Sequence, residues 1–365
     1  MTKVRAAVCH RHGAPLVIEE ITLADPAPGE VEVRISACAI CHSDISAASG
    51  GWGGKLPAVY GHEAAGRITR TGAGVTAHAP GDTVLVTLFR SCGHCGSCIN
   101  HHPGACQTHA DTDAHPITGP DGARYLQGLR TGAFAEAVVV DQSQVVAIPA
   151  DMPMDAASLL SCGVITGVGA VVNTAGLRPG QRAVVIGAGG VGLNAIQGAR
   201  IAGAAHIVAV DMMPEKLDIA MEFGATAGVL ATTSEPWKAA QKVMGAAADH
   251  VLVTTGAIQA YRTALRYLAY HGRLTIVGLP HNDQMAEYEP TIVGVTGQQI
   301  VGSKMGDGVL ARDIPWMVEL YRQGRLKLDE LVSRRWPLDR INEAIADTNS
   351  GAARRNVIVF DQGPQ

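Results

Sequence analysis

The sequence of 365 residues has few aromatic side chains and no excess of positive charge. Aromatic residues make up 4% and charged residues 17%, and the formal net charge is −4. The chain therefore lacks the basic footprint of a protein that binds nucleic acid or an anionic membrane. Its 43 glycines and 18 prolines are spread along the chain, which is typical of a turn-rich α/β enzyme rather than of a low-complexity segment. At about 150 residues per domain, the length predicts two domains.

A long, purely apolar run is also missing. The uncharged stretch 156–177 is long enough for a membrane span, but it contains Ser161, Thr166, Asn173, Thr174 and four glycines, so we expect no span. Met1 to His10 lacks the apolar core of a secretory signal, which predicts a cytoplasmic protein. In that reducing compartment, eight cysteines favour metal ligation or catalysis over disulfides.

The first 150 residues are predicted to form a turn-rich β domain with functional loops. From Arg182 onward, short apolar strands alternate with helical segments, which predicts a doubly wound parallel sheet. The last segment breaks this alternation and is expected to return to the first domain. The strands expected in the first half are 6–9, 16–20, 31–35, 66–70, 83–88, 134–140 and 145–148. The strands expected in the second half of the chain are 182–187, 206–211, around 229, 251–255, 273–279 and 299–301. A last strand is expected at 356–360.

A glycine-rich turn follows the predicted strand at 182–187 and opens a helix. It contains Gly187, Gly189, Gly190 and Gly192, the arrangement that lets a backbone approach a pyrophosphate at a helix N-terminus. Asp211 ends the next strand, 24 residues after Gly187, where a carboxylate can bind both ribose hydroxyls and repel a 2′-phosphate. The pattern favours NAD over NADP. The alternative is a structural βαβ unit without a cofactor.

Four cysteines lie close together on one loop, and they suit the closed tetrahedral shell of a structural zinc. Soft thiolate sets also bind iron–sulfur clusters, which is the alternative. The histidines of this region, including His109, are expected at the surface or behind the ligands. The four cysteines are Cys92, Cys95, Cys98 and Cys106.

A second, dispersed set consists of Cys41, His62 with Glu63, and Cys162. Two thiolates and one imidazole leave a fourth tetrahedral position open, as a catalytic zinc requires for a water or substrate oxygen. A single cysteine or histidine in an apolar run is more often a core residue, so only the combination carries the hypothesis. Cys9 and Cys38 lack such partners and are expected to be core thiols.

The chain resembles the zinc-dependent alcohol dehydrogenases of the medium-chain dehydrogenase/reductase superfamily over essentially its whole length. The resemblance implies a GroES-like β catalytic domain made of residues 1–163 and 301–365, with a structural-zinc lobe at about 91–107. A Rossmann NAD-binding domain of residues 164–300 lies between these two parts. It further implies two zinc ions per chain and a homodimer or homotetramer. The motifs that carry it are Cys41-His42-Ser43-Asp44, Gly61-His62-Glu63 with Gly66, the four cysteines, Ser161-Cys162-Gly163 with Thr166-Gly167, the glycine turn, and Asp211 with Lys216.

The same resemblance assigns a role to each matching residue. Cys41, His62 and Cys162 would bind the catalytic zinc, and Glu63 would move towards the metal during ligand exchange. Ser43 would hydrogen-bond the alcohol and pass on its proton, although it could instead only fill the turn after Cys41. For the cofactor, the assignments are His42 and Arg355 to the pyrophosphate, Thr166 and Val191 to the nicotinamide, Val277 and Leu279 to the carboxamide, and Asp211 with Lys216 to the adenosine side. Arg355 could equally be an ordinary surface cation.

The sequence departs from the family pattern at Ser46, where many relatives have a histidine in the proton relay. We therefore expect the proton to leave through water, Ser46 or another group. The polar loop from His109 to Arg130 also differs in length from several relatives. Trp52, Leu88, Phe89 and Phe134 are candidates for the wall of a substrate pocket, but each could equally be a core residue.

The expected activity is hydride transfer between a primary or secondary alcohol and NAD, giving an aldehyde or ketone. A formaldehyde or aldehyde dismutase, or a thiol-adduct formaldehyde dehydrogenase, would use the same zinc and NAD sites. A protein that binds zinc and nucleotide without catalysis is the alternative from another class. No nucleic-acid or membrane partner is expected.

Overall fold

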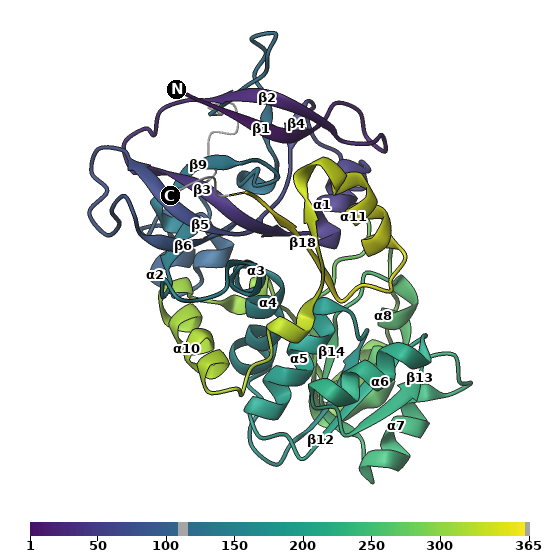
Figure 1. Cartoon of the computed structure of the whole chain (residues 1–365). Coiled ribbons are helices and arrows are strands. Elements are labelled where there is room, and N and C mark those ends of the chain that lie inside the picture. Colours follow the sequence, from purple (N-terminus) through teal and green to yellow (C-terminus); the bar gives the residue numbers. More distant parts are fainter. Residues whose placement is uncertain (109–115, 362–365) are drawn as a thin grey trace. The chain divides into compact units, whose positions relative to one another are not determined.

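The computed structural model describes residues 1–108 and 116–361, and it divides the chain into two compact units (Figure 1). The first unit contains Met1–Cys162, Val309–Tyr321 and Leu328–Gln365. The second contains Gly163–Gly308 and Arg322–Lys327. His109 and the start of the 109–130 loop lie outside the described residues.

Two sheets form the first unit. The larger has the strand order β10-β6-β5-β3-β18-β17, with β9 pairing with β3, and the smaller has the order β7-β2-β1-β4-β8. Strand β18, from the C-terminal part of the chain, lies between β3 and β17, so residues from both ends of the chain complete one sheet (Figure 1). The strands are β1 Thr2–Cys9, β2 Val17–Leu23, β3 Glu30–Ala39, β4 Ala58–Val59, β5 Glu63–Thr71, β6 Thr83–Thr87, β7 Ile117–Thr118, β8 Leu126–Gln127, β9 Ala137–Asp141, β10 Val145–Ala147, β17 Val332–Pro337 and β18 Arg355–Val359.

The core of the first unit explains its β structure. Strands β3, β5, β6 and β18 are rich in valine, isoleucine and alanine, and most of these side chains are buried in one cluster. β-Branched side chains favour the pleated backbone of a packed sheet. Short helices connect or cover the strands: α1 His42–Ala48, α2 Gly96–Ile99, α3 Met154–Ser158, α10 Leu310–Arg322 and α11 Ile341–Asn349.

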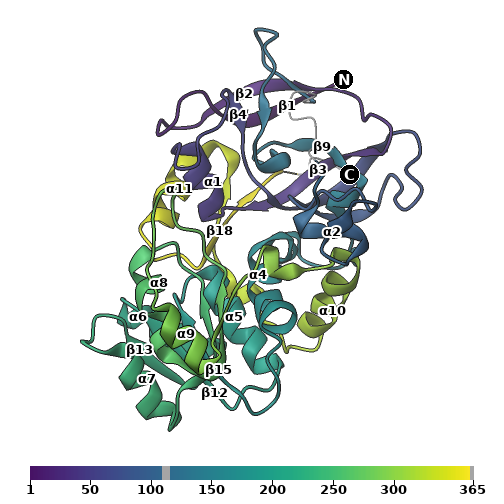
Figure 2. The same ribbon diagram turned by 180° about the vertical axis from the view of Figure 1, so that it is seen from behind.

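The second unit is a six-stranded parallel sheet. Its order, β13-β12-β11-β14-β15-β16, is 3-2-1-4-5-6 when the strands are counted along the chain, which is the doubly wound arrangement. Helices cover both faces: α5 and α6 lie in front of the sheet in Figure 1, and α9 in the reverse view of Figure 2. The strands are β11 Arg182–Ile186, β12 His206–Asp211, β13 Ala227–Leu230, β14 Ala248–Val253, β15 Leu268–Ile276 and β16 Gln299–Gly302. The helices are α4 Gly163–Gly169, α5 Gly190–Ile201, α6 Pro214–Phe223, α7 Pro236–Met244, α8 Ile258–Ala264 and α9 Pro290–Thr296.

The predicted α/β class and the parallel sheet are confirmed, although several strand bounds differ from the predicted ones. Strand β15 ends at Ile276, so the predicted strand 273–279 was too long at its C-terminal end, and Val277 and Leu279 follow the strand. The units also differ from the expected boundaries, because residues 301–308 and 322–327 lie in the second unit. Strand β16 pairs with β15 as far as Gly302, and the Gln197 side chain bonds both backbone groups of Lys327.

Among the described residues, no single helix is long and apolar enough to cross a membrane. One bent pair of helices, Met154–Ser161 with Gly163–Ala175, is long and apolar enough to cross a membrane when length and composition alone are considered. It overlaps the uncharged stretch 156–177, and its side chains are mostly buried within the protein.

Candidate active site

The first predicted metal ligand begins a helix. Cys41 is the N-cap residue of α1, in the extended backbone conformation, and Asp44 closes the first turn by accepting a hydrogen bond from the Cys41 N–H at 3.2 Å. This is a reciprocal capping box, in which the cap and the third helical residue satisfy each other's backbone groups. The cap therefore fixes the direction of the Cys41 side chain.

The Asp44 carboxylate also positions His62. Its Oδ1 accepts a hydrogen bond from the Gly61 N–H at 2.9 Å and lies 2.9 Å from His62 Nδ1. Asp44 is 2% exposed and His62 is fully buried. Because a carboxylate can only accept, His62 Nδ1 carries a proton, and Nε2 is the ring nitrogen that can bind a metal.

Gly61 lets another backbone pass close to His62. A Cβ atom at Gly61 would lie 2.5 Å from the Phe134 nitrogen, and the φ angle of Gly61 is +96°. The N–H groups of Ala133 and Phe134 donate to the carbonyls of Gly61 and Tyr60, both at 2.8 Å. The glycine before the histidine is therefore required by packing, and Phe134, proposed for the pocket wall, is 1% exposed in the core.

Cys162 comes from a distant part of the chain. It follows the turn Leu159–Ser161 with φ −146° and ψ −69°, which ends the helical run. The hydroxyl of Ser161 donates to the Ala64 carbonyl of β5 at 2.9 Å, so the segment is attached to the strand that begins at Glu63.

Four potential ligands thus meet in one buried place: Cys41, His62, Glu63 and Cys162 each offer an atom, and these atoms lie within 4.8 Å of one another. Within the described part of the chain, His62 Nε2 and both carboxylate oxygens of Glu63 are buried without a hydrogen-bond partner, and Glu63 Oε1 lies 3.6 Å from the Arg355 guanidinium. Buried polar atoms are costly without partners. A soft, tetrahedral cation bound by two sulfurs and a nitrogen would supply the missing partner, so the residues present fit zinc.

The electrostatics of this set favour a bound cation. The Cys162 thiol and His62 hold the pKa of Cys41 well below that of a free thiol, while the adjacent Cys41 thiolate and burial raise the pKa of Cys162. Burial raises the pKa of Glu63 to about 7, although the Arg355 guanidinium, 3.6 Å away, opposes the shift. Two thiolates and the Glu63 carboxylate would carry more negative charge than the single Arg355 guanidinium balances, so a bound cation would stabilise their ionised forms.

The four cysteines of the loop also lie together. Their sulfurs are within 4.8 Å of one another, with 4.0 Å between Cys92 and Cys98 and 3.9 Å between Cys95 and Cys106. Hydrogen bonds from the Thr108 side chain and from backbone N–H groups lower the pKa of Cys92 to about 5. Desolvation and the neighbouring sulfurs raise the pKa of Cys98 to about 11. Four thiolates at this spacing fit a closed zinc shell.

In the second unit, the glycine turn has two kinds of glycine. A Cβ at Gly192 would lie 1.8 Å from the Gly187 carbonyl oxygen, and Gly187 has φ +97°, so packing requires both. Gly189 has an ordinary φ of −79°, and nothing lies within 4 Å of a Cβ built there. The protein itself does not require this glycine, which fits a cradle for a ligand at the N-terminus of α5.

Asp211 lies beside this turn at the end of β12. Its Oδ2 accepts a hydrogen bond from the Ala188 N–H at 2.7 Å, and its Oδ1 accepts one from the Met213 N–H at 3.1 Å. The carboxylate is half-buried, so it fixes the turn and remains accessible to a ligand.

The chain is similar to known proteins over most of its length. Residues 27–150 match the alcohol dehydrogenase GroES-like domain, and residues 190–323 match the zinc-binding dehydrogenase model. An NDMA-dependent alcohol dehydrogenase of Amycolatopsis methanolica is 34% identical over 370 residues, which cover 98% of this chain and 99% of that protein. The chain belongs to the zinc-dependent alcohol dehydrogenases of the medium-chain dehydrogenase/reductase superfamily.

Solved structures of this family have the same fold as the present chain. An alcohol dehydrogenase zinc-binding domain protein from Burkholderia ambifaria is 33% identical with a TM-score of 0.95. The benzyl alcohol dehydrogenase of Acinetobacter calcoaceticus is 28% identical with a TM-score of 0.93. Both alignments cover 99% of this chain and 100% of the other. The GroES-like domain expected from the sequence is thereby confirmed.

The remaining residues assigned from the alcohol dehydrogenase family lie in both units. In the first, His42 is exposed and Ser43 half-buried in the first turn of α1, one and two residues after Cys41. Arg355 is 6% exposed and lies beside Glu63, with a hydrogen bond to the Ile40 carbonyl at 3.4 Å, so it is not an ordinary surface cation. Its pyrophosphate contact stays a prediction.

In the second unit, the Thr166 hydroxyl donates to the sulfur of Met305 at 3.5 Å. Gly167 brings α4 against α5 at Val191, because a Cβ there would lie 2.5 Å from the Val191 oxygen. Lys216 is half-buried in α6, and Val277 is 8% exposed. Leu279 is 66% exposed, although its side chain is apolar.

The sequence analysis missed the role of Asp44. It quoted the residue within a motif but gave it no function, although an acid three residues after a helix N-cap is the signal of a capping box. That signal predicts the bond to Cys41. It does not predict the bond to His62, which depends on how β5 meets α1.

Proposed function

We propose that the protein oxidises primary or secondary alcohols to aldehydes or ketones, with zinc and NAD as cofactors. In the reverse direction it would reduce the aldehyde or ketone to the alcohol. The observation that carries this proposal is the buried set of Cys41, His62 and Cys162, whose imidazole Nε2 has no hydrogen-bond partner among the described residues. When bound there, zinc would act as a Lewis acid towards the alcohol oxygen, and NAD would accept the hydride.

The protein's own residues would orient and deprotonate the substrate. Asp44 fixes the tautomer of His62, and Glu63 is placed to enter the ligand set during exchange. Ser43, two residues after Cys41, would accept the hydroxyl proton and pass it on. Ser46 and water remain the candidates for the next step of proton release.

The second unit would hold the cofactor. The turn from Gly187 to Gly192 would bind the pyrophosphate, with Gly190 opening the helix, and the Asp211 carboxylate would favour NAD over NADP through charge repulsion of a 2′-phosphate. The roles of His42, Arg355, Thr166, Val191, Lys216, Val277 and Leu279 in cofactor binding remain proposals from the family resemblance.

The four-cysteine loop would hold a second, structural zinc. Metal analysis should therefore find two zinc ions per chain. Replacing Cys162 with Ala should remove activity and one zinc ion and leave the fold intact, whereas replacing Cys95 with Ala should remove the other zinc ion and chiefly lower stability. A chain with one zinc or none, after purification without chelators, would contradict the pairing.

The decisive experiment is a panel of primary, secondary and aromatic alcohols assayed by NADH absorbance. We expect turnover with at least one alcohol and a higher kcat/KM with NAD than with NADP. Because one relative is named as NDMA-dependent, NDMA is tested in parallel. If the protein oxidises an alcohol with NDMA but not with added NAD, the proposal of alcohol oxidation stands. The proposal that free NAD accepts the hydride is then rejected. No turnover of any alcohol by zinc-loaded protein would reject the function.

Two further measurements on the purified protein separate the alternative activities. NAD that stays bound through purification would indicate a dismutase, and dependence on an added thiol would indicate thiol-adduct formaldehyde oxidation. We further propose a cytoplasmic homodimer or homotetramer, to be measured by light scattering. The eight cysteines, all within the described residues, form no disulfide, which suits a reducing compartment.

A further inference from the structure

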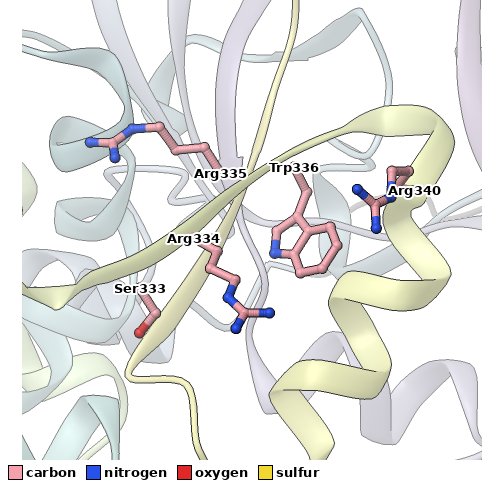
Figure 3. A pocket seen from close by; sticks show the side chains of 5 residues that line it. All are labelled: Ser333, Arg334, Arg335, Trp336 and Arg340. Carbon is pink, nitrogen blue, oxygen red and sulfur yellow. The ribbon is translucent and has the colours of Figure 1, made fainter.

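The first unit has a polar depression formed by the edge strand β17 and the turn that leads into α11. Its volume is about 450 Å³. Figure 3 shows Arg334 and Arg340 extending on either side of Trp336. The lining consists of Ser333, Arg334, Arg335, Trp336 and Arg340, with no carboxylate among them.

Trp336 is held in a fixed position between two cations. Its Nε1 donates to Asn356 Oδ1 at 3.0 Å, and the residue is 8% exposed. The guanidinium carbons of Arg334 and Arg340 lie 5.9 Å and 4.9 Å from the ring centroid, within the range of cation–π attraction. The ring therefore holds both guanidinium groups in place before any ligand arrives.

The backbone of β17 is irregular where it borders the depression. Side chains alternate between the two faces of a regular strand, and Figure 3 shows Arg335 extending away from Trp336 and Arg334, where it pairs with Asp155. The pairing of β17 with β18 shifts between Val332 and Arg334, and the Ser333 hydroxyl accepts a hydrogen bond from the Arg354 N–H at 2.8 Å. Such a bulge redirects side chains, and bulges recur beside functional sites.

The carboxylate partners of these arginines leave donors available. Arg334 contacts Asp347 through one nitrogen at 3.3 Å. Arg340 contacts both carboxylate oxygens of Glu343, through Nε at 2.9 Å and through one terminal nitrogen, so these contacts use only part of the donors of each guanidinium. The Arg334 and Arg340 side chains are 63% and 54% exposed, and ion pairs at such exposure are weak because water screens them. A guanidinium has five N–H donors in a planar fork that matches an oxyanion.

We propose that this depression, the Trp336 site, binds a phosphate group. The chemistry is shared by free phosphate and by a small phosphomonoester, since both present the oxygens that a guanidinium fork binds bidentately. The site uses none of the residues assigned to metal or NAD, so it stands independently of the proposed function.

The test is the tryptophan emission of the full-length, zinc-loaded protein during titration with inorganic phosphate at constant ionic strength. We expect a saturable change with a dissociation constant of about 1 mM or lower. The change should vanish in Trp336→Phe, which keeps Trp52, Trp237 and Trp316 as an internal background. Glycerol phosphate in a second titration distinguishes the sources, because tighter binding than inorganic phosphate identifies a phosphomonoester ligand.

The double variant Arg334→Gln/Arg340→Gln should weaken phosphate binding by at least about tenfold, the effect of losing charge-assisted hydrogen bonds. The double variant Lys238→Gln/Arg262→Gln removes the same charge from the second unit and should bind as the wild type does. Melting temperatures confirm that each variant is folded. An emission change that equal ionic strength in sodium chloride reproduces, or that survives in the Arg334→Gln/Arg340→Gln protein, overturns the proposal.

Discussion

At the scale of single residues, Asp44 does most to organise the site, because one carboxylate contacts the backbone of Cys41, the backbone of Gly61 and the ring of His62. In Asp44→Asn an amide group would place a donor against one of these N–H groups. We expect zinc to bind about 10- to 100-fold more weakly, as for other groups that orient metal ligands. Competition with a chelator measures the zinc affinity of the variant and of the wild type.

Asp141→Asn is the control for that substitution. Asp141 caps the turn Gln142–Gln144 through the Ser143 N–H at 2.9 Å and touches no metal ligand. Because asparagine caps a helix about as well as aspartate, its substitution should change stability little and leave zinc affinity unchanged. Equal zinc affinity in the Asp44→Asn protein and the wild type would show that Asp44 only caps the helix.

Ser43 also belongs to the residue scale. Ser43→Ala should lower alcohol oxidation about a hundredfold or more, because a positioned proton acceptor is lost, while zinc content and NAD affinity stay unchanged. Ser46→Ala, on the same helix, is the matched variant and measures the next step of proton release. Near wild-type turnover of Ser43→Ala at every pH at which the protein is folded would mean that Ser43 only fills the turn.

At the scale of elements, the turn between β11 and α5 separates a packing requirement from a binding requirement. Gly192→Ala would force a Cβ to 1.8 Å from a carbonyl oxygen, so we expect a destabilisation of about 3 kcal/mol or more. Gly189→Ala faces open space, so the melting temperature should hold while NADH binds at least about tenfold more weakly. Calorimetry and NADH fluorescence titration measure the two effects. Unchanged NADH affinity of Gly189→Ala would place the pyrophosphate elsewhere.

At the scale of the whole molecule, buried His250 makes stability depend on pH. Burial lowers its pKa, helped by Arg273 and opposed by Asp249, and its Nε2 lies 3.0 Å from the Gln181 side-chain oxygen. The unfolded chain therefore takes up this proton more readily, so the free energy of unfolding falls as pH drops below about 6.5. Urea titrations should show a smaller loss in His250→Gln than in the wild type. An unchanged slope in His250→Gln would contradict the assignment.

The sequence alone was sufficient for features whose signals are local. The order of the elements in the second unit, the glycine turn and the clustered cysteines depend on residues within a few turns or one loop of each other, and spacing alone constrains their geometry. The position of Asp211 after the next strand is of the same kind. The ends of strands were predicted less accurately, as at Val277. The last backbone hydrogen bonds of a strand depend on where its neighbouring strand ends, and the local sequence does not specify that.

Only the tertiary structure decided how distant segments meet. Cys41, His62 and Cys162 have no spacing rule between them, and they meet because β3, β5 and the turn at Ser161 pack together. The dual role of Asp44 and the position of Arg355 beside Glu63 follow from the same packing. Strand β18 enters the N-terminal sheet between β3 and β17 because both of its edges find partners there and its side chains fill the core. Such contacts result from minimising the free energy of the whole chain, so no local pattern in the sequence specifies them.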